Sequence, residues 1–122
     1  MNIGLWIVQA LTALAFGQHA WLMLFRLERA RDRLVWMRDV PTTLLRAIGV
    51  IEFLGAVGVV LPAATGVLPG LSLVAAAGLL AIMVLAMAFH LVRRERPNLV
   101  LNLMLGLLAA IVVYGRLAIA PF

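Results

Sequence analysis

The chain has 122 residues, enough for one domain; 66% of them are hydrophobic and only 12% carry a charged side chain. A soluble domain of this size buries only about 60–70% of the surface that its unfolded chain exposes, so it could not hide this much apolar surface. The formal net charge of +5 comes from Arg in short runs between apolar stretches, which is typical of membrane proteins and argues against a nucleic-acid-binding surface.

Four apolar stretches are long enough to cross about 30 Å of hydrocarbon as helices that rise about 1.5 Å per residue. They run over about 3–25, 44–61, 71–92 and 99–119. The first lacks a basic region before it and is too long for a cleavable signal peptide. Backbone groups in hydrocarbon must be paired within one segment, and the sequence lacks the alternating segments of a barrel. The predicted fold is an all-α membrane four-helix bundle, up-down-up-down, forming one transmembrane domain over 1–122.

The connection over 26–43 is rich in Arg and in acidic residues. Glu28 and Asp32 are spaced to pair with Arg side chains one turn away, which predicts a short amphipathic helix at the membrane surface. Trp36 lies among apolar neighbours and is expected to anchor this segment at the level of the lipid headgroups. Pro41 ends the segment before the second span begins.

The other two connections are short. Residues 62–70 carry no charge and are expected to form a turn, whereas residues 93–98 are basic. Because the basic connections 26–43 and 93–98 fall on the same side, the positive-inside rule places that side in the cytoplasm and both termini outside. Arg46 and Arg116 are expected to extend to opposite membrane interfaces.

Polar side chains of all four predicted spans lie in the half of the bundle near the basic connections. By the helical rise, His19 and Glu52 lie about 9 and 12 Å deep, Asn102 about 3–5 Å and His90 about 3 Å. Polar residues at such depths avoid lipid and face the bundle interior or a cavity. We therefore expect a ligand-binding cluster formed by Glu52, His19, Gln18, Asn102 and His90.

Glu52 and His19 are the candidate catalytic residues. A carboxyl group near the middle of the membrane is either neutral or paired. Arg46 lies about 240° round the helix from Glu52, so the partner must come from another helix, where His19 is nearest in depth. The two residues either handle protons and orient a ligand, or form a structural hydrogen bond between helices. His90, beside basic residues at a helix end, fits an interface position as well as a binding one.

No motif indicates a metal site or a resident cofactor. The chain has no Cys, which excludes thiol–disulfide relays, Fe–S clusters and thiolate metal sites within it. The two His and Glu52 have no local spacing of the kind that metal ligands show. Small residues such as Gly49, Gly55 and Ala56 predict close packing between helices, with a homodimer face as the alternative.

Three stretches resemble the DoxX-like family of membrane proteins. The stretch RAIGVIEFLGAVGVVLPAATG, Arg46 to Gly66, is similar to the second-helix signature of the family, an Arg-x-Ile-Gly-x-x-Glu-x-x-Gly core followed by Pro. Residues 75–95 resemble the third helix, which ends in His and a basic run, and residues 101–116 resemble the fourth. Relatives carry a small residue and then Lys near the end of the first helix, where this chain has Gln18 and His19.

The resemblance implies a four-helix protein of the bacterial inner membrane. The family takes its name from a subunit of a thiosulfate:quinone oxidoreductase, and other members are linked to oxidative stress or to assembly. The first hypothesis is a redox-linked component that binds a lipophilic small molecule, with quinone as one candidate, in the polar cluster. The second is a non-catalytic subunit or assembly factor whose Arg-rich segment contacts a protein partner or anionic lipid. The third is a stand-alone lipid-modifying or isomerising enzyme that uses Glu52 and His19 as acid and base.

Overall fold

A computed structural model of the chain describes residues 2–119 and residue 121. The regular elements in this part of the chain are α1 (Asn2–Phe25), α2 (Leu27–Arg33), the 3-10 turn η1 (Val35–Asp39), α3 (Thr42–Thr65), α4 (Gly70–Val92), α5 (Arg96–Tyr114) and the π-helical turn η2 (Gly115–Ile119). Each of α1, α3, α4 and the continuous α5–η2 segment is long and apolar enough to cross a membrane. The predicted all-helical fold with four spans is confirmed.

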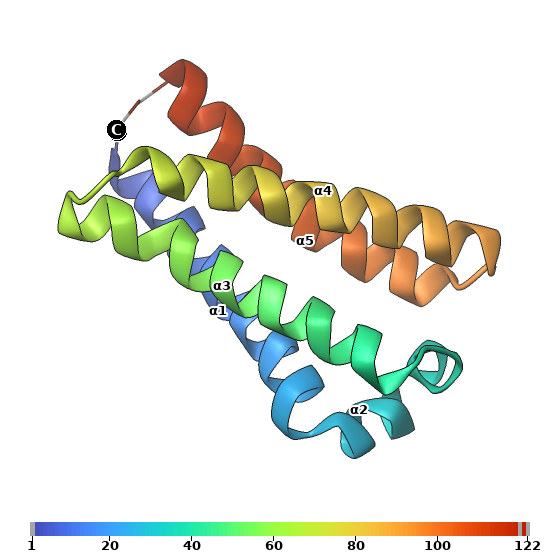
Figure 1. The fold of residues 1–122 in the computed structure, drawn as a ribbon. Coiled ribbons are helices and arrows are strands. Elements are labelled where there is room, and N and C mark those ends of the chain that lie inside the picture. Colours follow the sequence, from blue (N-terminus) through green and yellow to red (C-terminus); the bar gives the residue numbers. More distant parts are fainter. Residues whose placement is uncertain (1, 120, 122) are drawn as a thin grey trace.

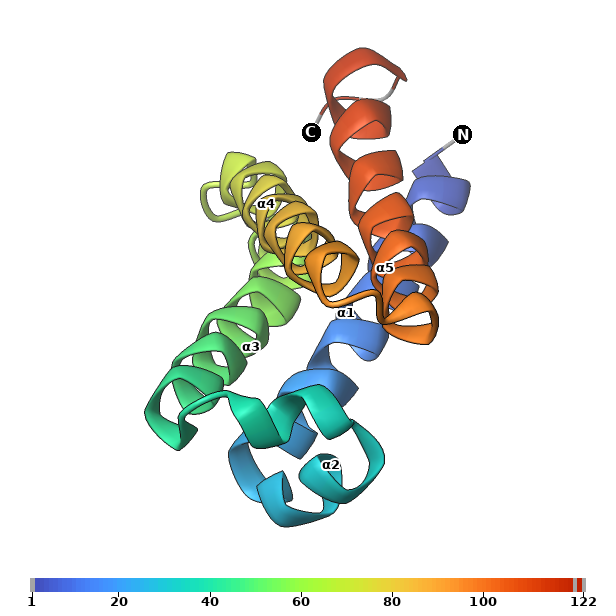
Figure 2. The same cartoon turned by 90° about the vertical axis from the view of Figure 1, so that its right-hand side faces the viewer.

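The long helices alternate in direction and form two pairs (Figure 1). α1 packs along α3 and α4 packs along α5, while contacts between α3 and α4 and between α1 and α5 join the pairs. The termini and the α3–α4 connection lie at one end of the bundle, whereas α2, η1 and the α4–α5 connection lie at the other, called the α2 end below. Figure 1 shows that α3 and α4 diverge from their connection toward the α2 end, and Figure 2 looks onto that end.

Two apolar clusters hold the bundle together. The first lies between the long helices and comprises Phe16, Ala56, Val59, Ala76, Leu79, Met83, Leu105, Ala109 and Val112. The second packs α2 and η1 onto the bundle and comprises Met23, Leu27, Ala30, Met37, Val40 and Leu45. His19 lies between the two clusters along α1, and Glu52 lies between them along α3. The polar residues therefore occupy the junction between two apolar cores.

α3 extends beyond residue 61, where a turn was expected to begin, and contains Pro62. Proline lacks the N–H that would continue the helical hydrogen bonds, so helices usually stop near it. Here the next N–H, that of Ala63, donates a 3.1 Å hydrogen bond to the Ser72 hydroxyl of α4. The helix ends at Gly66, whose φ of 76° suits glycine because it has no Cβ.

The expected amphipathic helix is present as α2, and the chain then returns along it as η1. The side chain of Arg31 in α2 holds η1 and the start of α3 against α2. Its Nε donates to the Met37 carbonyl at 3.2 Å, and its Nη2 donates to the Val40 carbonyl at 3.2 Å and to the Thr42 hydroxyl at 2.9 Å. One arginine therefore holds three consecutive parts of the connection in place, so this charge serves the fold of the segment.

Candidate functional site

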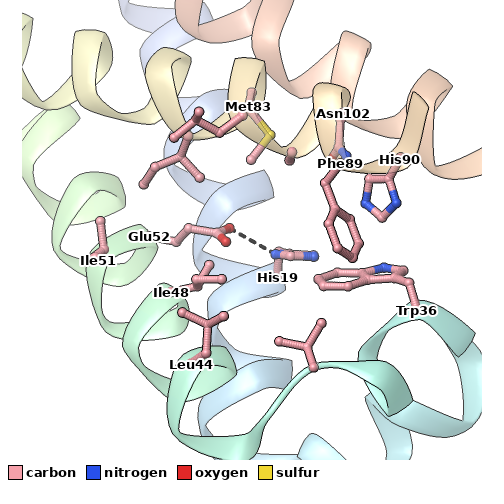
Figure 3. A pocket seen from close by; sticks show the side chains of 14 residues that line it. His19, Trp36, Leu44, Ile48, Ile51, Glu52, Met83, Phe89, His90 and Asn102 are labelled. Carbon is pink, nitrogen blue, oxygen red and sulfur yellow. Dashed lines mark hydrogen bonds and ion pairs between the residues drawn. The ribbon is translucent and has the colours of Figure 1, made fainter. Parts of the chain in front are cut away.

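A cavity of about 350 Å³ lies between the long helices at the α2 end. Each long helix contributes one polar side chain to its lining: His19 from α1, Glu52 from α3, His90 from α4 and Asn102 from α5. Figure 3 shows these side chains around a shared space, with two aromatic rings among them. The structure therefore brings together four of the five residues predicted to bind a ligand.

Glu52 and His19 form the most deeply placed part of this site. Glu52 belongs to the buried stripe of α3, so its side chain points into the bundle and is only 1% exposed. Its Oε1 lies 2.9 Å from Nδ1 of His19, and the opposite side of the imidazole ring points toward Trp36 and Phe89 (Figure 3). The partner of the buried carboxyl is thus the residue that the depth comparison indicated.

Asn102 presents its side chain to the cavity and has no hydrogen-bond partner from the described part of the chain. It lies on the inner face of α5, is 6% exposed and lines the cavity. A carboxamide carries two donor hydrogens and an acceptor oxygen. A polar group placed in the cavity could form hydrogen bonds with them.

His90 is buried, although its position at the end of a helix was equally compatible with the membrane interface. Its Nδ1 lies 2.7 Å from Oε1 of Glu95, because the chain after α4 turns back over the ring. The same carboxylate oxygen accepts a 3.1 Å hydrogen bond from Nε of Arg93, and Nη2 of Arg93 lies 2.5 Å from Oδ2 of Asp39 in η1. These four residues, called the closing network below, connect the α4–α5 connection to η1.

The contacts of the closing network shift the pKa values of Glu95 and Arg93, two members that lie outside the membrane spans. Desolvation acts to raise the pKa of Glu95, but the hydrogen bonds from Arg93 and His90 outweigh it, and the pKa falls below its ordinary value of 4.5. Hydrogen bonds to Glu95 and Asp39 raise the pKa of Arg93. Glu95 is therefore an anion at neutral pH, and the network is held by opposite charges.

Trp36 also lines the cavity, a contact that the predicted position at the lipid headgroups did not indicate. Its ring centroid lies 5.0 Å from that of His90 and 5.8 Å from that of Phe89, both in edge-to-face geometry. All three rings line the cavity. No local signal could have indicated this contact, because it joins η1 to a helix more than fifty positions later.

Gln18 does not take part in the site. It is exposed on α1 and is not among the residues that line the cavity. Neighbouring residues in a helix point about 100° apart, so Gln18 cannot share the inward direction of His19. Its depth was suitable for the polar cluster, but its face of the helix was not.

A second polar cluster lies toward the end that carries the termini, and it corrects the prediction for Arg116. This arginine was expected to extend to the membrane interface, yet it is buried. Its Nε donates a 2.7 Å hydrogen bond to Oε1 of Gln9, and Nε2 of Gln9 donates to the Val59 carbonyl at 2.8 Å. The guanidinium carbon also lies 5.3 Å from the centre of the Trp6 ring. A charge-assisted hydrogen bond and a cation–π contact within the bundle take the place of the expected contact with water.

The donor set at the cavity suits hydrogen bonding and proton exchange. Among the described residues, no three His, Asp or Glu side chains lie close enough together to hold a metal ion. His19 and Glu52 share a proton-bearing contact, while Asn102 offers donors and an acceptor whose chemistry does not change with pH. The arrangement can orient a polar group and exchange a proton with it.

Comparison with known proteins places this architecture in a family. No curated protein and no solved structure matches the chain. The sequence model of the DoxX-like family matches residues 7–112, a stretch that contains all the residues lining the cavity and most of each span. Since the match extends over far more than half of its length, the chain belongs to the DoxX-like family of membrane proteins.

Proposed function

We propose that this protein binds a lipophilic molecule with a polar head group in the cavity at the α2 end. The observation that carries the proposal is Asn102, whose carboxamide lines the cavity without a hydrogen-bond partner among the described residues. A head group that forms hydrogen bonds supplies that partner, and the apolar walls from α3 and α4 accept hydrocarbon. The described cavity lining contains no Arg, so it favours a neutral head group over a phosphate.

Quinones are the class of ligand that we consider first. Their carbonyl oxygens accept hydrogen bonds of the kind that Asn102 donates, and their planar rings suit the aromatic walls formed by Trp36 and Phe89. Reduction of a quinone consumes protons, which the His19–Glu52 pair is suited to supply. The electrons come from a redox partner, so the part proposed for this chain is binding and proton exchange within a redox-linked system. The proposal places the α2 end, with its many Arg residues, on the cytoplasmic side of the inner membrane.

The first test is to identify what the protein retains when it is taken directly from the membrane into polymer-bounded nanodiscs. Mass spectrometry of the extracted lipids should find a neutral lipophile enriched over discs prepared from the same membranes without the protein. Asn102→Leu keeps the volume of the side chain but removes the amide, so we expect retention to fall about five- to tenfold, as the loss of roughly one hydrogen bond implies. Asn98→Leu, one helical turn away and outside the cavity lining, is the matched control and should retain the wild-type amount.

Titration of the purified protein with a short-chain benzoquinone tests the class of ligand directly. Saturable binding that Asn102→Leu weakens and Asn98→Leu leaves unchanged supports the proposal. Equal retention by both variants, together with no saturable binding of the benzoquinone, contradicts it.

A further inference from the structure

The cavity meets the outer surface of the bundle between two membrane-spanning helices. Ile51 of α3 and Leu85 of α4 line the cavity and yet are 52% and 71% exposed. Both lie well inside segments that are long and apolar enough to cross a membrane, so the medium on this side is hydrocarbon. α3 and α4 diverge toward the α2 end, where the cavity lies (Figure 1). We call the opening of the cavity that Ile51 and Leu85 border from these two helices the portal.

The route from water, by contrast, is covered at the α2 end. Trp36 packs against Phe89 and His90 at the base of the cavity, as Figure 3 shows. Outside these rings, the ion pair between Arg93 and Asp39 connects the chain after α4 to η1. A ligand from the aqueous side must part aromatic contacts and an ion pair, whereas a ligand dissolved in the bilayer meets only aliphatic side chains.

We infer that the occupant of the cavity enters sideways from the bilayer through the portal between α3 and α4, and that its hydrocarbon tail stays there while its head reaches Asn102 and the His19–Glu52 pair. This inference rests on the proposed function and adds the route and the form of the ligand. A cavity of about 350 Å³ lies near the lower end of the range of roughly 300–1,000 Å³ found for small-molecule sites, which fits a head of about one ring. The ligand class is therefore a membrane-dissolved molecule with one small, planar, uncharged head and an apolar tail.

The absence of Cys from the sequence allows a clean chemical test of this route. Leu85→Cys places a thiol on the rim of the portal, and a bulky hydrophobic methanethiosulfonate reagent then blocks it in the folded protein. Val84→Cys is the matched control, because Val84 is the neighbouring residue of α4, is also exposed and does not line the cavity. Ile51→Cys provides a second variant on the opposite rim.

Quenching of Trp36 fluorescence measures the arrival of the ligand. The measurement uses protein in nanodiscs in which Trp6→Phe and Trp21→Phe remove the other two Trp residues. The probe is a benzoquinone with a decyl tail, and a benzoquinone without the tail serves as a head-only probe. We expect labelling at position 85 or 51 to slow uptake of the tailed probe at least tenfold, labelling at position 84 to change it less than twofold, and a reducing agent to restore it. Positions 85 and 51 lie on the rims of the cavity, whereas the head-only probe contacts Asn102 and the His19–Glu52 pair, so labelling should weaken its equilibrium binding less than it slows uptake of the tailed probe.

Two different failures are distinguishable. Equal uptake of the tailed probe by discs labelled at positions 84, 85 and 51 overturns the portal and leaves the proposed function standing. Absence of binding of either probe to the unlabelled protein overturns the proposed function, and the portal with it.

Discussion

The carboxyl of Glu52 is held inside the bundle by a hydrogen bond to a residue 33 positions earlier in the chain. This bond joins the acid to the imidazole of His19 in the apolar junction between the two cores. The pair is thus a link between α1 and α3, and it lines the cavity with two groups that can exchange a proton.

The His19–Glu52 pair predicts an asymmetric response to substitution. Glu52→Gln retains a hydrogen-bonding group of the same size, so we expect it to lower the free energy of unfolding by less than about 1 kcal/mol, the scale of hydrogen bonds between membrane helices. His19→Leu leaves the carboxyl alone in the interior, and we expect a loss of about 3–5 kcal/mol. Unfolding in mixed detergent micelles, followed by circular dichroism, measures both values.

The double variant provides the control for this comparison. Combining His19→Leu with Glu52→Leu removes the isolated acid, so the double variant should be more stable than His19→Leu alone. If the effects of the two substitutions simply add, the pair is not coupled and this interpretation is wrong.

At the scale of elements, the cavity is closed by segments that are themselves too short to span a membrane. η1 carries Trp36 and Asp39, and the α4–α5 connection carries Arg93 and Glu95. The closing network and the aromatic contacts of Trp36 join these two segments to each other. The mobility of this closure should therefore respond to conditions that leave the four long helices intact.

The closing network predicts a response to acid. Glu95 has a pKa below its ordinary value of 4.5, so its contribution to stability is complete above that value and is lost as the pH falls through the lower pKa of the folded state. The charged and titratable partners that it faces are Arg93 and His90, with Asp39 linked through Arg93. We expect the emission of Trp36, in the background without the other two Trp residues, to change only below pH 4.5.

Two variants check the origin of this transition. Glu95→Gln should show the altered emission already at neutral pH, with little further change on acidification. Glu28→Gln, which replaces an exposed acid of α2, should behave like the parent protein. A transition that persists unchanged in Glu95→Gln assigns it to another group and contradicts the prediction.

Hydropathy predicted the spans correctly because only helices and closed barrels pair all their backbone groups in lipid. It does not indicate which face of a helix points into the bundle. Depth alone indicated that His19 and Glu52 meet, whereas Gln18, at the same depth, points outward. Pro62 suggested a turn because the sequence does not reveal that Ser72 of another helix takes up the following N–H. The position of Trp36 likewise depends on α4, a partner remote in the chain. For Pro62 and Trp36, sequence analysis missed a contact between elements, and for Gln18 it missed the direction in which the side chain points.

At the scale of the whole molecule, polar groups form two clusters separated along the bundle axis by the first apolar core. One comprises the cavity residues, and the other joins Arg116 to Gln9 and to the backbone of α3. The second cluster connects α1, α3 and the end of the α5–η2 segment. It therefore links these three segments at the end of the bundle opposite the cavity.

The second cluster predicts that Gln9 is important for stability. Gln9→Leu removes a hydrogen bond to a buried guanidinium and leaves the Val59 carbonyl without its side-chain donor, so we expect a loss of about 1.5–3 kcal/mol. The matched control is Gln18→Leu, the same change at an exposed position of the same helix, which should alter stability by no more than about 0.5 kcal/mol. Thermal unfolding in detergent measures both, and equal losses in the two variants would refute the role of the cluster.

The short connection between α3 and α4, with the Ala63–Ser72 hydrogen bond beside it, joins the two helix pairs at one end, and α3 and α4 diverge toward the other (Figure 1). A small rotation at the joined end therefore moves the α2 end, where the cavity lies, over a larger distance. We expect the thickness and lateral pressure of the surrounding bilayer to act on the width of the cavity. Since the proposed function puts a ligand there, the composition of the membrane should influence the affinity for that ligand.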